Sequence, residues 1–485
     1  MKLPDAFQEK MKTALGPEEW EAFRSSYEEP APKGLRINTL KGSLPLLQEA
    51  YDLPLTPVPW EPAGYYYDEM LVQPGKYALH EAGAYYIQEP SAMLPAALLA
   101  PLPGEKVLDL CAAPGGKTLQ LACALQGEGL LVSNEIHPAR ARILSENVER
   151  CGIPNAMVCN ETPDRLAARC SAFFDRVLVD APCSGEGMFR KNPDAVSEWS
   201  PENVALCARR QDEILDQAAG CLRPGGRLVY STCTFSPEED EECVERFLSR
   251  HPDYSLIKME KLLPHRVCGD GQFAAVFERA GGQAASVSAP LLQKEAETRD
   301  RREIRDRRET RGRNGIRQET DPRREALSQR RMERNGGRNK PRKLISCPAE
   351  LTELWKETPD PARLFPFGDR LFLLPEGAIS PEGLKVLRPG LCLGAYKKDR
   401  FEPDHALALS LRPDEACRSV SLDEKEAVSY LLGNTISRET ENGWTLVTYA
   451  GYSLGFGKAV NNVIKNHYPK GLRTQCALHS ARQAP

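Results

Sequence analysis

The sequence contains no long apolar run, no Cys-x-x-Cys pair and no secretory leader pattern at its start. Its longest apolar run, residues 92–103, is interrupted by prolines and is too short to cross a bilayer. Residues 1–10 carry charges of both signs, whereas a leader begins with a basic region followed by an apolar one. We therefore expect a cytoplasmic protein with no membrane partner.

The 15 cysteines are scattered along the chain, and the closest two, Cys151 and Cys159, are eight residues apart. This spacing argues against a structural zinc site. A long chain without a leader also favours reduced thiols over disulfides. We expect no bound metal, and we expect most of the cysteines to be small buried hydrophobic residues.

The net charge of −4 is unevenly distributed over the 485 residues. Residues 294–343 hold 19 Lys and Arg against 10 Asp and Glu, a surplus of +9, which leaves −13 for the remainder. The segment 281–343 has almost no aromatic or β-branched residues and cannot bury enough surface to fold. We expect a basic disordered linker, which is either a solvated spacer or a weak, salt-sensitive tether for phosphates.

From residue 105 onward, predicted strands alternate with predicted helices, which is typical of a mostly parallel sheet covered on both faces. The predicted strands are 107–110, 129–135, 157–160, 177–180, 228–232 and 272–278, and the predicted helices are 118–125, 138–151, 201–222 and 238–250. About three domains are expected for this length.

The flanking regions have a different pattern. Before residue 100 we predict helices at 4–15, 18–26 and 43–51, a strand at 35–39, a loop at 54–62, and tyrosines at 65–86 that either pack or stack on bases. After the linker we predict short strands within 365–374 and 386–394, a helix at 422–432 and a strand at 444–449. The final segment, 455–473, mixes basic and aromatic residues, which suits RNA contact or a merely solvated face.

The segment after the strand 107–110 is built from small residues and leads into a helix. Its Gly-Lys-Thr at 116–118 resembles the end of a nucleoside-triphosphate phosphate loop. Such a loop needs a glycine where this chain has Cys111, and Pro114 has no N–H group to offer a phosphate. The three spaced glycines of a dinucleotide loop are also missing. The segment does allow close backbone approach at a strand end, which suits an adenosyl ligand with a compact amino-acid group.

Glu135 ends the next predicted strand, 19 residues after Gly116. An acid at this place in an α/β sheet accepts hydrogen bonds from ribose hydroxyls. The alternative is an exposed terminal glutamate without a ligand. The small-residue turn that precedes Glu135 favours the ribose interpretation.

Two further strand ends carry a cysteine. The apolar run 177–179 stops at Asp180, and Cys183 follows in a loop of proline and glycine; fifty residues later a second strand ends at Cys233. A single thiol at a strand end is more often inert, but two thiols and an acid at one crevice favour covalent chemistry. Thiolates attack electron-poor carbons such as carbon 6 of a pyrimidine, after which carbon 5 can take a methyl group and a base must remove its proton. The spacing does not tell which thiol attacks.

Three chemistry-bearing segments occur in a fixed order: 111–118 (Cys-Ala-Ala-Pro-Gly-Gly-Lys-Thr), 180–185 (Asp-Ala-Pro-Cys-Ser-Gly) and 231–234 (Ser-Thr-Cys-Thr). As a set they resemble the Nop/Sun-type RNA 5-methylcytosine methyltransferases. The segments 35–39 and 80–91 are also similar to that family. The segments 185–191 and 465–473 narrow the resemblance to the bacterial RsmF-like rRNA branch. The resemblance extends over residues 1–280 and, more loosely, over 344–485.

The resemblance implies S-adenosylmethionine as methyl donor and RNA as partner. The residues that it places on the methionine side of the donor are Cys111, Ala112, Ala113, Pro114, Gly115, Gly116 and Lys117. It implies that Glu135 holds the ribose and that Asp180 lies between donor and base and bonds the cytosine ring. Cys233 would attack carbon 6, and Cys183 would assist release of the methylated product.

One segment departs from the family pattern. The family commonly places an Asp near the adenine after the third strand, but residues 160–164 read Asn-Glu-Thr-Pro-Asp. Thr162 is nearest to the expected place, so the adenine contact falls to Thr162, Asn160 or a backbone group. The segment 281–343 resembles an insertion between the catalytic region and the C-terminal domains.

Taken together, these features predict an α/β protein with a Rossmann-like class I methyltransferase core. A mostly parallel seven-stranded sheet is expected at 101–280, an α+β RNA-binding region at 1–100, and an α+β PUA-like RNA-binding region at 344–485. We expect a monomeric enzyme that methylates carbon 5 of a cytosine in RNA, with small-subunit rRNA as substrate and a flipped or unpaired target base. The alternatives are a methyltransferase for tRNA or another RNA base, and a non-catalytic RNA-binding protein of ribosome assembly.

Overall fold

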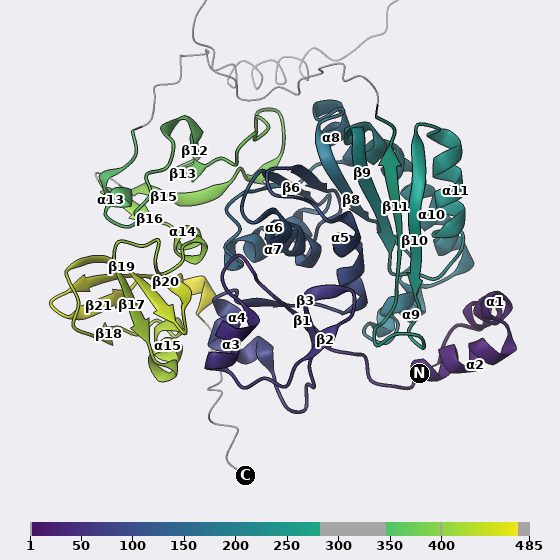
Figure 1. Cartoon of the computed structure of the whole chain (residues 1–485), viewed down its shortest axis with the longest axis horizontal. Coiled ribbons are helices and arrows are strands. Elements are labelled where there is room, and N and C mark those ends of the chain that lie inside the picture. Colours follow the sequence, from purple (N-terminus) through teal and green to yellow (C-terminus); the bar gives the residue numbers. More distant parts are fainter. Residues whose placement is uncertain (1, 282–345, 398–399, 474–485) are drawn as a thin grey trace, which may run out of the picture. The chain divides into compact units, whose positions relative to one another are not determined.

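The computed structural model describes residues 2–281, 346–397 and 400–473 (Figure 1). The linker predicted at 281–343 therefore lies outside the described residues except for its first position. Within these residues, no helix combines the length and the apolar character that a membrane crossing requires.

An eight-stranded sheet forms the centre of the catalytic region, with the order β10-β11-β9-β8-β5-β6-β7-β14. Its strands are β5 (Lys106–Asp109), β6 (Leu130–Asn134), β7 (Ala156–Cys159), β8 (Phe174–Asp180), β9 (Leu222–Thr232), β10 (Tyr254–Leu262), β11 (Gln272–Arg279) and β14 (Val386–Arg388). Strands β5 to β9 pair in parallel, whereas β10, β11 and β14 pair antiparallel. The mostly parallel sheet and the Rossmann-like class are as predicted, and seven strands come from the predicted core.

Two strands of this sheet differ from the sequence prediction. The strand β10 was not predicted, because its central residues, 255–259, are all exposed and show no alternation of apolar and polar positions. The eighth strand, β14, comes from the C-terminal region, where Val386 pairs opposite Cys159 and Arg388 opposite Val158.

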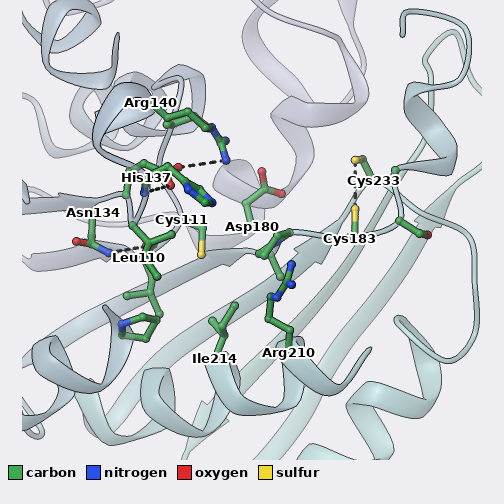
Figure 2. Close-up of a pocket in the computed structure, with 18 of the residues that line it drawn as sticks. Leu110, Cys111, Asn134, His137, Arg140, Asp180, Cys183, Arg210, Ile214 and Cys233 are labelled. Carbon is green, nitrogen blue, oxygen red and sulfur yellow. Dashed lines mark hydrogen bonds and ion pairs between the residues drawn. The ribbon is translucent and has the colours of Figure 1, made fainter. Parts of the chain in front are cut away.

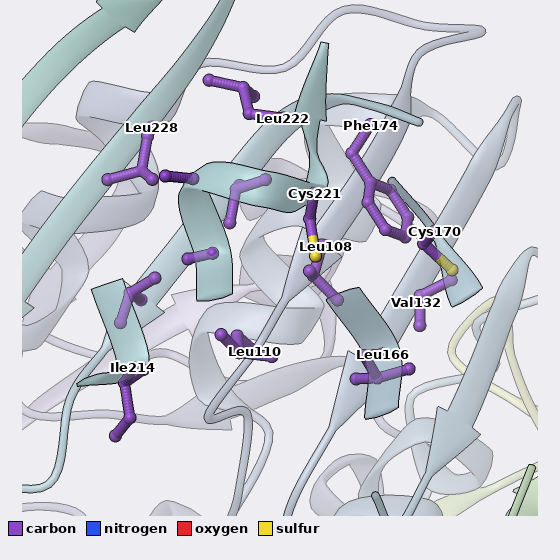
Figure 3. Close-up of a cluster of buried hydrophobic side chains, with 14 of the residues drawn as sticks. Leu108, Leu110, Val132, Leu166, Cys170, Phe174, Ile214, Cys221, Leu222 and Leu228 are labelled. Carbon is purple, nitrogen blue, oxygen red and sulfur yellow. The ribbon is translucent and has the colours of Figure 1, made fainter. Parts of the chain in front are cut away.

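Helices cover both faces of the sheet. One face packs on α8 (Pro163–Arg169), α10 (Pro201–Cys221) and α11 (Glu241–Arg250), and the other on α5 (Leu94–Leu99), α6 (Gly116–Leu125) and α7 (Pro138–Arg150). Val177 and Val179 of β8 join the first core, with Ile214 of α10 (Figure 3), while Leu178 joins the second. This alternation explains why buried parallel strands are continuously apolar. Each fully buried side chain of this size contributes about 1.5–3 kcal/mol.

The N-terminal region carries a four-stranded sheet of order β2-β3-β1-β4. Its elements are α1 (Asp5–Leu15), α2 (Pro17–Ser26), β1 (Gly34–Ile37), α3 (Leu44–Ala50), β2 (Thr56–Val58), β3 (Glu61–Tyr66), α4 (Ala78–Glu81) and β4 (Tyr85–Ile87). The loop predicted at 54–62 is wrong, because this segment forms β2 and the start of β3. Tyr77, Tyr85 and Tyr86 are buried, so these three tyrosines pack instead of offering a stacking surface.

The C-terminal region contains two further sheets, of orders β12-β13-β15-β16 and β17-β19-β20-β21-β18. The strands are β12 (Leu364–Phe367), β13 (Arg370–Leu373), β15 (Leu391–Lys397), β16 (Arg400–Pro403), β17 (Ser419–Leu422), β18 (Ile436–Ser437), β19 (Gly443–Tyr449), β20 (Tyr452–Val460) and β21 (Val463–Asn466). The helices are α13 (Ala349–Thr352), α14 (His405–Ser410) and α15 (Glu424–Leu431), and α9 (Pro193–Glu198) belongs to the catalytic region. Both α and β elements therefore occur on each side of the segment 282–345.

Candidate active site

The carboxyl ends of β5, β6, β8 and β9 border a cavity of about 1040 Å³. The predicted site residues that line it are Cys111, Ala113, Glu135, Thr162, Asp180, Cys183 and Cys233. Figure 2 shows several of these side chains around the cavity. The other predicted residues of the described structure are not among those that line the cavity: Ala112, Pro114, Gly115, Gly116 and Lys117. A topology that brings parallel strand ends to one edge therefore unites residues more than 120 positions apart.

The loop 111–117 is held from two sides. The Ala112 N–H donates to the backbone oxygen of Asn134 at 2.8 Å, and side chains of α7 donate to the loop's carbonyls. Arg140 Nη2 donates to the oxygen of Ala113 at 2.7 Å, and Asn147 Nδ2 to that of Pro114 at 2.8 Å. These bonds aim the loop at the cavity without a phosphate-binding nest.

Gly115 lies at φ +118°, in the region that side chains rarely adopt. A Cβ at this position would approach Leu144 Cδ1 to 3.2 Å. The glycine therefore lets the loop turn closely over α7 at the start of α6.

Asp109 and Thr118 join the end of β5 to the first turn of α6. Thr118 Oγ1 donates to Asp109 Oδ2 at 2.7 Å, and both side chains are buried. Burial raises the pKa of Asp109 to about 7, and the Thr118 hydrogen bond opposes that shift. This pair fixes the turn that carries the loop 111–117.

Glu135 is only 3% exposed, yet its carboxylate faces the cavity. Its Oε1 accepts the His137 N–H at 2.9 Å, and its Oε2 lies 3.4 Å from Arg140 Nη1. A carboxylate only accepts hydrogen bonds, so its remaining capacity suits hydroxyl donors such as those of a ribose. Arg140, which the sequence analysis missed, thus links Glu135, the residue predicted to bind the ribose, to Ala113 of the loop.

The structure distinguishes between Thr162 and Asn160, the two side chains predicted as alternatives for the adenine contact. Thr162 lines the cavity and precedes α8, whereas both amide hydrogens of Asn160 are engaged. Asn160 Nδ2 donates to the backbone oxygens of Glu135 at 2.7 Å and Ile136 at 2.8 Å. Of these two residues, Thr162 is the one in contact with the cavity.

Asp180 is held by three donors. Lys117 Nζ lies 2.8 Å from Oδ2, while Ser231 Oγ at 2.8 Å and Gln272 Nε2 at 3.2 Å donate to Oδ1. Burial alone would lower the pKa of Lys117, but the neighbouring Asp180 outweighs it and the pKa is raised. Lys117 therefore remains a cation that orients Asp180. The sequence could not show this pairing, because the partners are 63 residues apart.

The two predicted thiols meet at the cavity: Cys183 Sγ lies 3.4 Å from Cys233 Sγ (Figure 2). The hydrogen bond with Cys233, together with burial, raises the pKa of Cys183 well above its ordinary value. The two sulfurs are within hydrogen-bond distance, and either thiol can act as the donor.

The two cysteine loops are tied to each other by hydrogen bonds along their length. The Ala181 N–H donates to the oxygen of Ser231 at 2.9 Å, and the Gly187 N–H donates to the oxygen of Cys233 at 2.8 Å. The hydroxyls of Ser184 and Thr234 are 2.8 Å apart. The separation of the thiols is therefore set by the backbone of both loops.

Glu186 is a further residue of this junction that the sequence analysis did not single out. It is fully buried and accepts Trp199 Nε1 at 2.9 Å and the Phe235 N–H at 2.7 Å. Its place between two glycines after Cys183 is the only signal in the sequence, and that signal does not reveal an inward side chain.

The cysteines outside the site show mixed burial. Of the fourteen cysteines in the described residues, seven are buried: Cys151, Cys159, Cys170, Cys207, Cys221, Cys243 and Cys392. In the same part of the chain, no group of three or more His, Cys, Asp or Glu side chains is arranged to hold a metal ion.

Four family descriptions match successive parts of the chain. "16S rRNA methyltransferase RsmB/F" matches residues 96–278, and "N-terminal domain of 16S rRNA methyltransferase RsmF" matches residues 3–90. "RsmF rRNA methyltransferase first C-terminal domain" matches residues 349–411, and "Methyltransferase RsmF PUA domain" matches residues 417–474. The matches leave the segment between residues 278 and 349 unassigned.

Curated relatives match over nearly the whole chain. Ribosomal RNA small subunit methyltransferase F of Vibrio vulnificus is 33% identical over 497 residues, covering 97% of each chain. The protein of the same name from Cronobacter sakazakii is 32% identical over 496 residues, covering 99% of this chain and 98% of the relative.

Two solved structures share the fold. A methyltransferase homolog protein from Pyrococcus horikoshii is 27% identical, with a TM-score of 0.50 over 57% of this chain and 100% of that chain. NSun6 from Pyrococcus horikoshii with SFG is 22% identical, with a TM-score of 0.53 over 57% of this chain and 99% of that chain. The second likeness bears on the fold alone.

Proposed function

Because the chain belongs to the RsmF family of 16S rRNA methyltransferases, we propose that it transfers a methyl group from S-adenosylmethionine to carbon 5 of a cytosine in small-subunit rRNA. The observation that carries this proposal is the pair of thiols 3.4 Å apart beside Asp180, at the edge of the cavity. A covalent route to a pyrimidine ring needs one nucleophile and one group that handles the departing proton.

The residues around the cavity fit S-adenosylmethionine, which supplies the methyl group. Glu135 offers acceptor oxygens to ribose hydroxyls, and Thr162 stands where the adenine is expected. The loop 111–117 offers close backbone approach on the methionine side. These assignments use the buried, acceptor-only chemistry of Glu135 as their physical basis.

We assign the attack on the base to Cys233. Its sulfur forms a bond to carbon 6, the electron pair of the carbon 5–carbon 6 double bond moves to carbon 5, and carbon 5 takes the methyl group. The two sulfurs lie 3.4 Å apart, and in this proposal Cys183 is the donor and stabilises the attacking sulfur of Cys233. Asp180, oriented by Lys117, accepts a hydrogen bond from the amino group of the cytosine.

We assign product release to Cys183. Once Cys233 is bonded to carbon 6, its uncharged sulfur no longer sustains the hydrogen bond that is the largest cause of the raised pKa of Cys183, ahead of burial. In this proposal, Cys183 then loses its own proton to the cavity. Its thiolate then takes the proton from carbon 5. The double bond re-forms, the carbon 6–sulfur bond breaks, and Cys233 returns as a thiolate.

The C-terminal region is proposed to bind RNA, as is the region 1–100, while 101–280 carries catalysis. A cavity of about 370 Å³ is lined by Trp444, His467 and Arg370, among others. Lys458 Nζ lies 5.6 Å from the ring centroid of Trp444, and the His467 ring lies 4.5 Å from it. Trp444 is itself buried, so the exposed Lys458 and His467 beside it are the groups proposed to meet the RNA. The cytoplasmic, monomeric state and a tethering role of the linker belong to the same proposal.

Mapping of 5-methylcytosine with and without this gene tests the proposal. We expect at least one cytosine of small-subunit rRNA to lose its methyl group on deletion and to regain it with the wild-type gene. Loss confined to tRNA would reassign the substrate. An unchanged map together with no binding of S-adenosylmethionine by calorimetry would favour a non-catalytic RNA-binding protein.

A further inference from the structure

Arg210 lies on α10 and lines the large cavity near the two thiols. It is exposed, and Figure 2 shows its side chain rising from the helix toward the segment that carries Asp180 and Cys183. The mechanism proposed above assigns no role to Arg210. A cationic side chain that points toward the reacting groups and has no assigned role is a candidate for binding a ligand.

The other cations at this cavity are already engaged. Lys117 pairs with Asp180 at 2.8 Å, and Arg140 bonds the oxygen of Ala113 and pairs with Glu135. The guanidinium group of Arg210 makes no hydrogen bond or ion pair with any residue that the structure describes. Its five N–H donors are thus free for a ligand that brings acceptor oxygens.

The surroundings of Arg210 select what that ligand is. Glu198 and Glu213 also line the cavity, and Glu213 follows Arg210 by one helical turn. Neither carboxylate pairs with Arg210 among the described residues. These two carboxylates disfavour an anion at their own positions, whereas the positive charge of Arg210 attracts one.

A nucleotide whose base enters the cavity brings its own phosphodiester with it. The base must reach the two thiols, and the sugar and phosphate follow within a few ångströms of the ring. Arginine binds phosphate oxygens through two parallel hydrogen bonds, which also fix the orientation of the group. We propose that Arg210 is an anion subsite that binds a phosphodiester flanking the target cytosine and so positions the flipped nucleotide.

This inference rests on the proposed function, and its test separates the two. Small ribosomal subunits and extracted rRNA are prepared from a strain that lacks the gene. The substrate for the test is the one of these two that the wild-type enzyme methylates. Methylation by the wild type tests the function itself. Arg210→Gln then tests the subsite, with Arg209→Gln as matched control, since Arg209 is the exposed neighbouring arginine that stands outside the lining.

We expect Arg210→Gln to raise the KM for RNA about tenfold, the scale of one charge-assisted contact. The slope of log affinity for RNA against log salt should fall by about 1, because one phosphate contact is lost. The affinity for S-adenosylmethionine, measured by calorimetry, should stay within twofold, and Arg210→Lys should recover part of the KM. Arg209→Gln should leave all of these values within twofold.

Two results would overturn the subsite. A loss of S-adenosylmethionine affinity in Arg210→Gln, with unchanged salt dependence of RNA binding, would assign Arg210 to the carboxylate of the methyl donor. Equal behaviour of Arg210→Gln and Arg209→Gln would show a solvated arginine. An inactive wild type would instead overturn the proposed function.

Discussion

At the scale of single residues, two identical side chains are proposed to have different tasks. Cys183 and Cys233 both follow a strand of the same sheet, and their sulfurs are 3.4 Å apart. The hydrogen bond with Cys233, followed by burial, raises the pKa of Cys183. The family resemblance assigns the attack to Cys233.

Replacement of the nucleophile should stop the reaction before any bond forms. Cys233→Ala removes the sulfur that attacks carbon 6, so methylation should fall below detection. The donor site is untouched, because Glu135 and the loop 111–117 have other supports. Calorimetry should show S-adenosylmethionine binding within about twofold of wild type; measurable turnover in this variant would refute the assignment.

Replacement of the second thiol should stop the reaction after the covalent bond has formed. Cys183→Ala leaves Cys233 able to attack but removes the group proposed to take the carbon 5 proton. An RNA–protein adduct should therefore accumulate and appear as a denaturant-resistant band on a gel. The double variant with Cys233→Ala is the control and should show no band. An adduct in Cys233→Ala alone would mean that the two roles are reversed.

At the scale of elements, the thiol pair depends on the segment 181–192 being packed against the end of β9. A Cβ at Gly187 would lie 2.9 Å from the carbonyl oxygen of Cys233, just after β9, and 3.0 Å from that of Asp270, just before β11. Glu186, the neighbour of Gly187, accepts a hydrogen bond from the Phe235 N–H, two residues after Cys233. The proposed nucleophile, Cys233, is thus supported by Glu186 and Gly187, which are not among the residues that line the cavity.

We expect Gly187→Ala to displace the backbone of Cys233, at a cost of about 1–3 kcal/mol of stability. The kcat should fall at least tenfold while the affinity for S-adenosylmethionine stays within twofold, measured by single-turnover kinetics and calorimetry. The matched control is Gly220→Ala, because a Cβ at Gly220 would meet nothing within 4 Å. Equal kcat values for the two variants would show that the close approach at Gly187 does not position Cys233.

At the scale of the whole molecule, residues on both sides of the segment 282–345 complete one sheet. Strand β14 pairs with β7, and Arg388 of β14 forms an ion pair with Glu149 of α7. The Lys385 N–H donates to Glu161 Oε1 at 2.6 Å, next to Thr162. The edge of the proposed adenine site is therefore reinforced by residues more than 200 positions later in the chain.

RNA binding should be electrostatic and should depend on the C-terminal basic and aromatic residues. Lys458 of β20 lies over the Trp444 ring, and Lys465 of β21 is paired opposite Lys458. We expect the double variant Lys458→Gln/Lys465→Gln to lower affinity for small-subunit rRNA about tenfold or more and to reduce the salt slope by about 2. Lys425→Gln, an exposed lysine of α15, is the control for general charge. Filter binding across a salt series measures both the affinity and the salt slope. Identical slopes for the double variant and the wild type would contradict the proposed RNA surface.

Local pattern was sufficient for the catalytic sheet and insufficient for its edges. The buried strands β5 to β9 follow from their apolar runs, and α7 and α10 follow from their periodicity and from Pro138 and Pro201 in the first turn. The strand β10 has no apolar face, the short helix α8 begins within the Asn-Glu-Thr-Pro-Asp segment, and β2 has only three residues. Such elements are formed by tertiary pairing, which no local window contains.

What the sequence determined by itself is the set of buried strands β5 to β9, the residues placed at strand ends and, through the motif set, the methyltransferase family. These are properties of neighbouring residues, so they can be read along the chain. Only the tertiary structure decided which groups engage each other: Lys117 with Asp180, Cys183 with Cys233, Arg140 with Glu135, and Arg210 with none of the described residues. Those pairings join distant positions, and their energies depend on distance and burial, which exist only once the chain has folded.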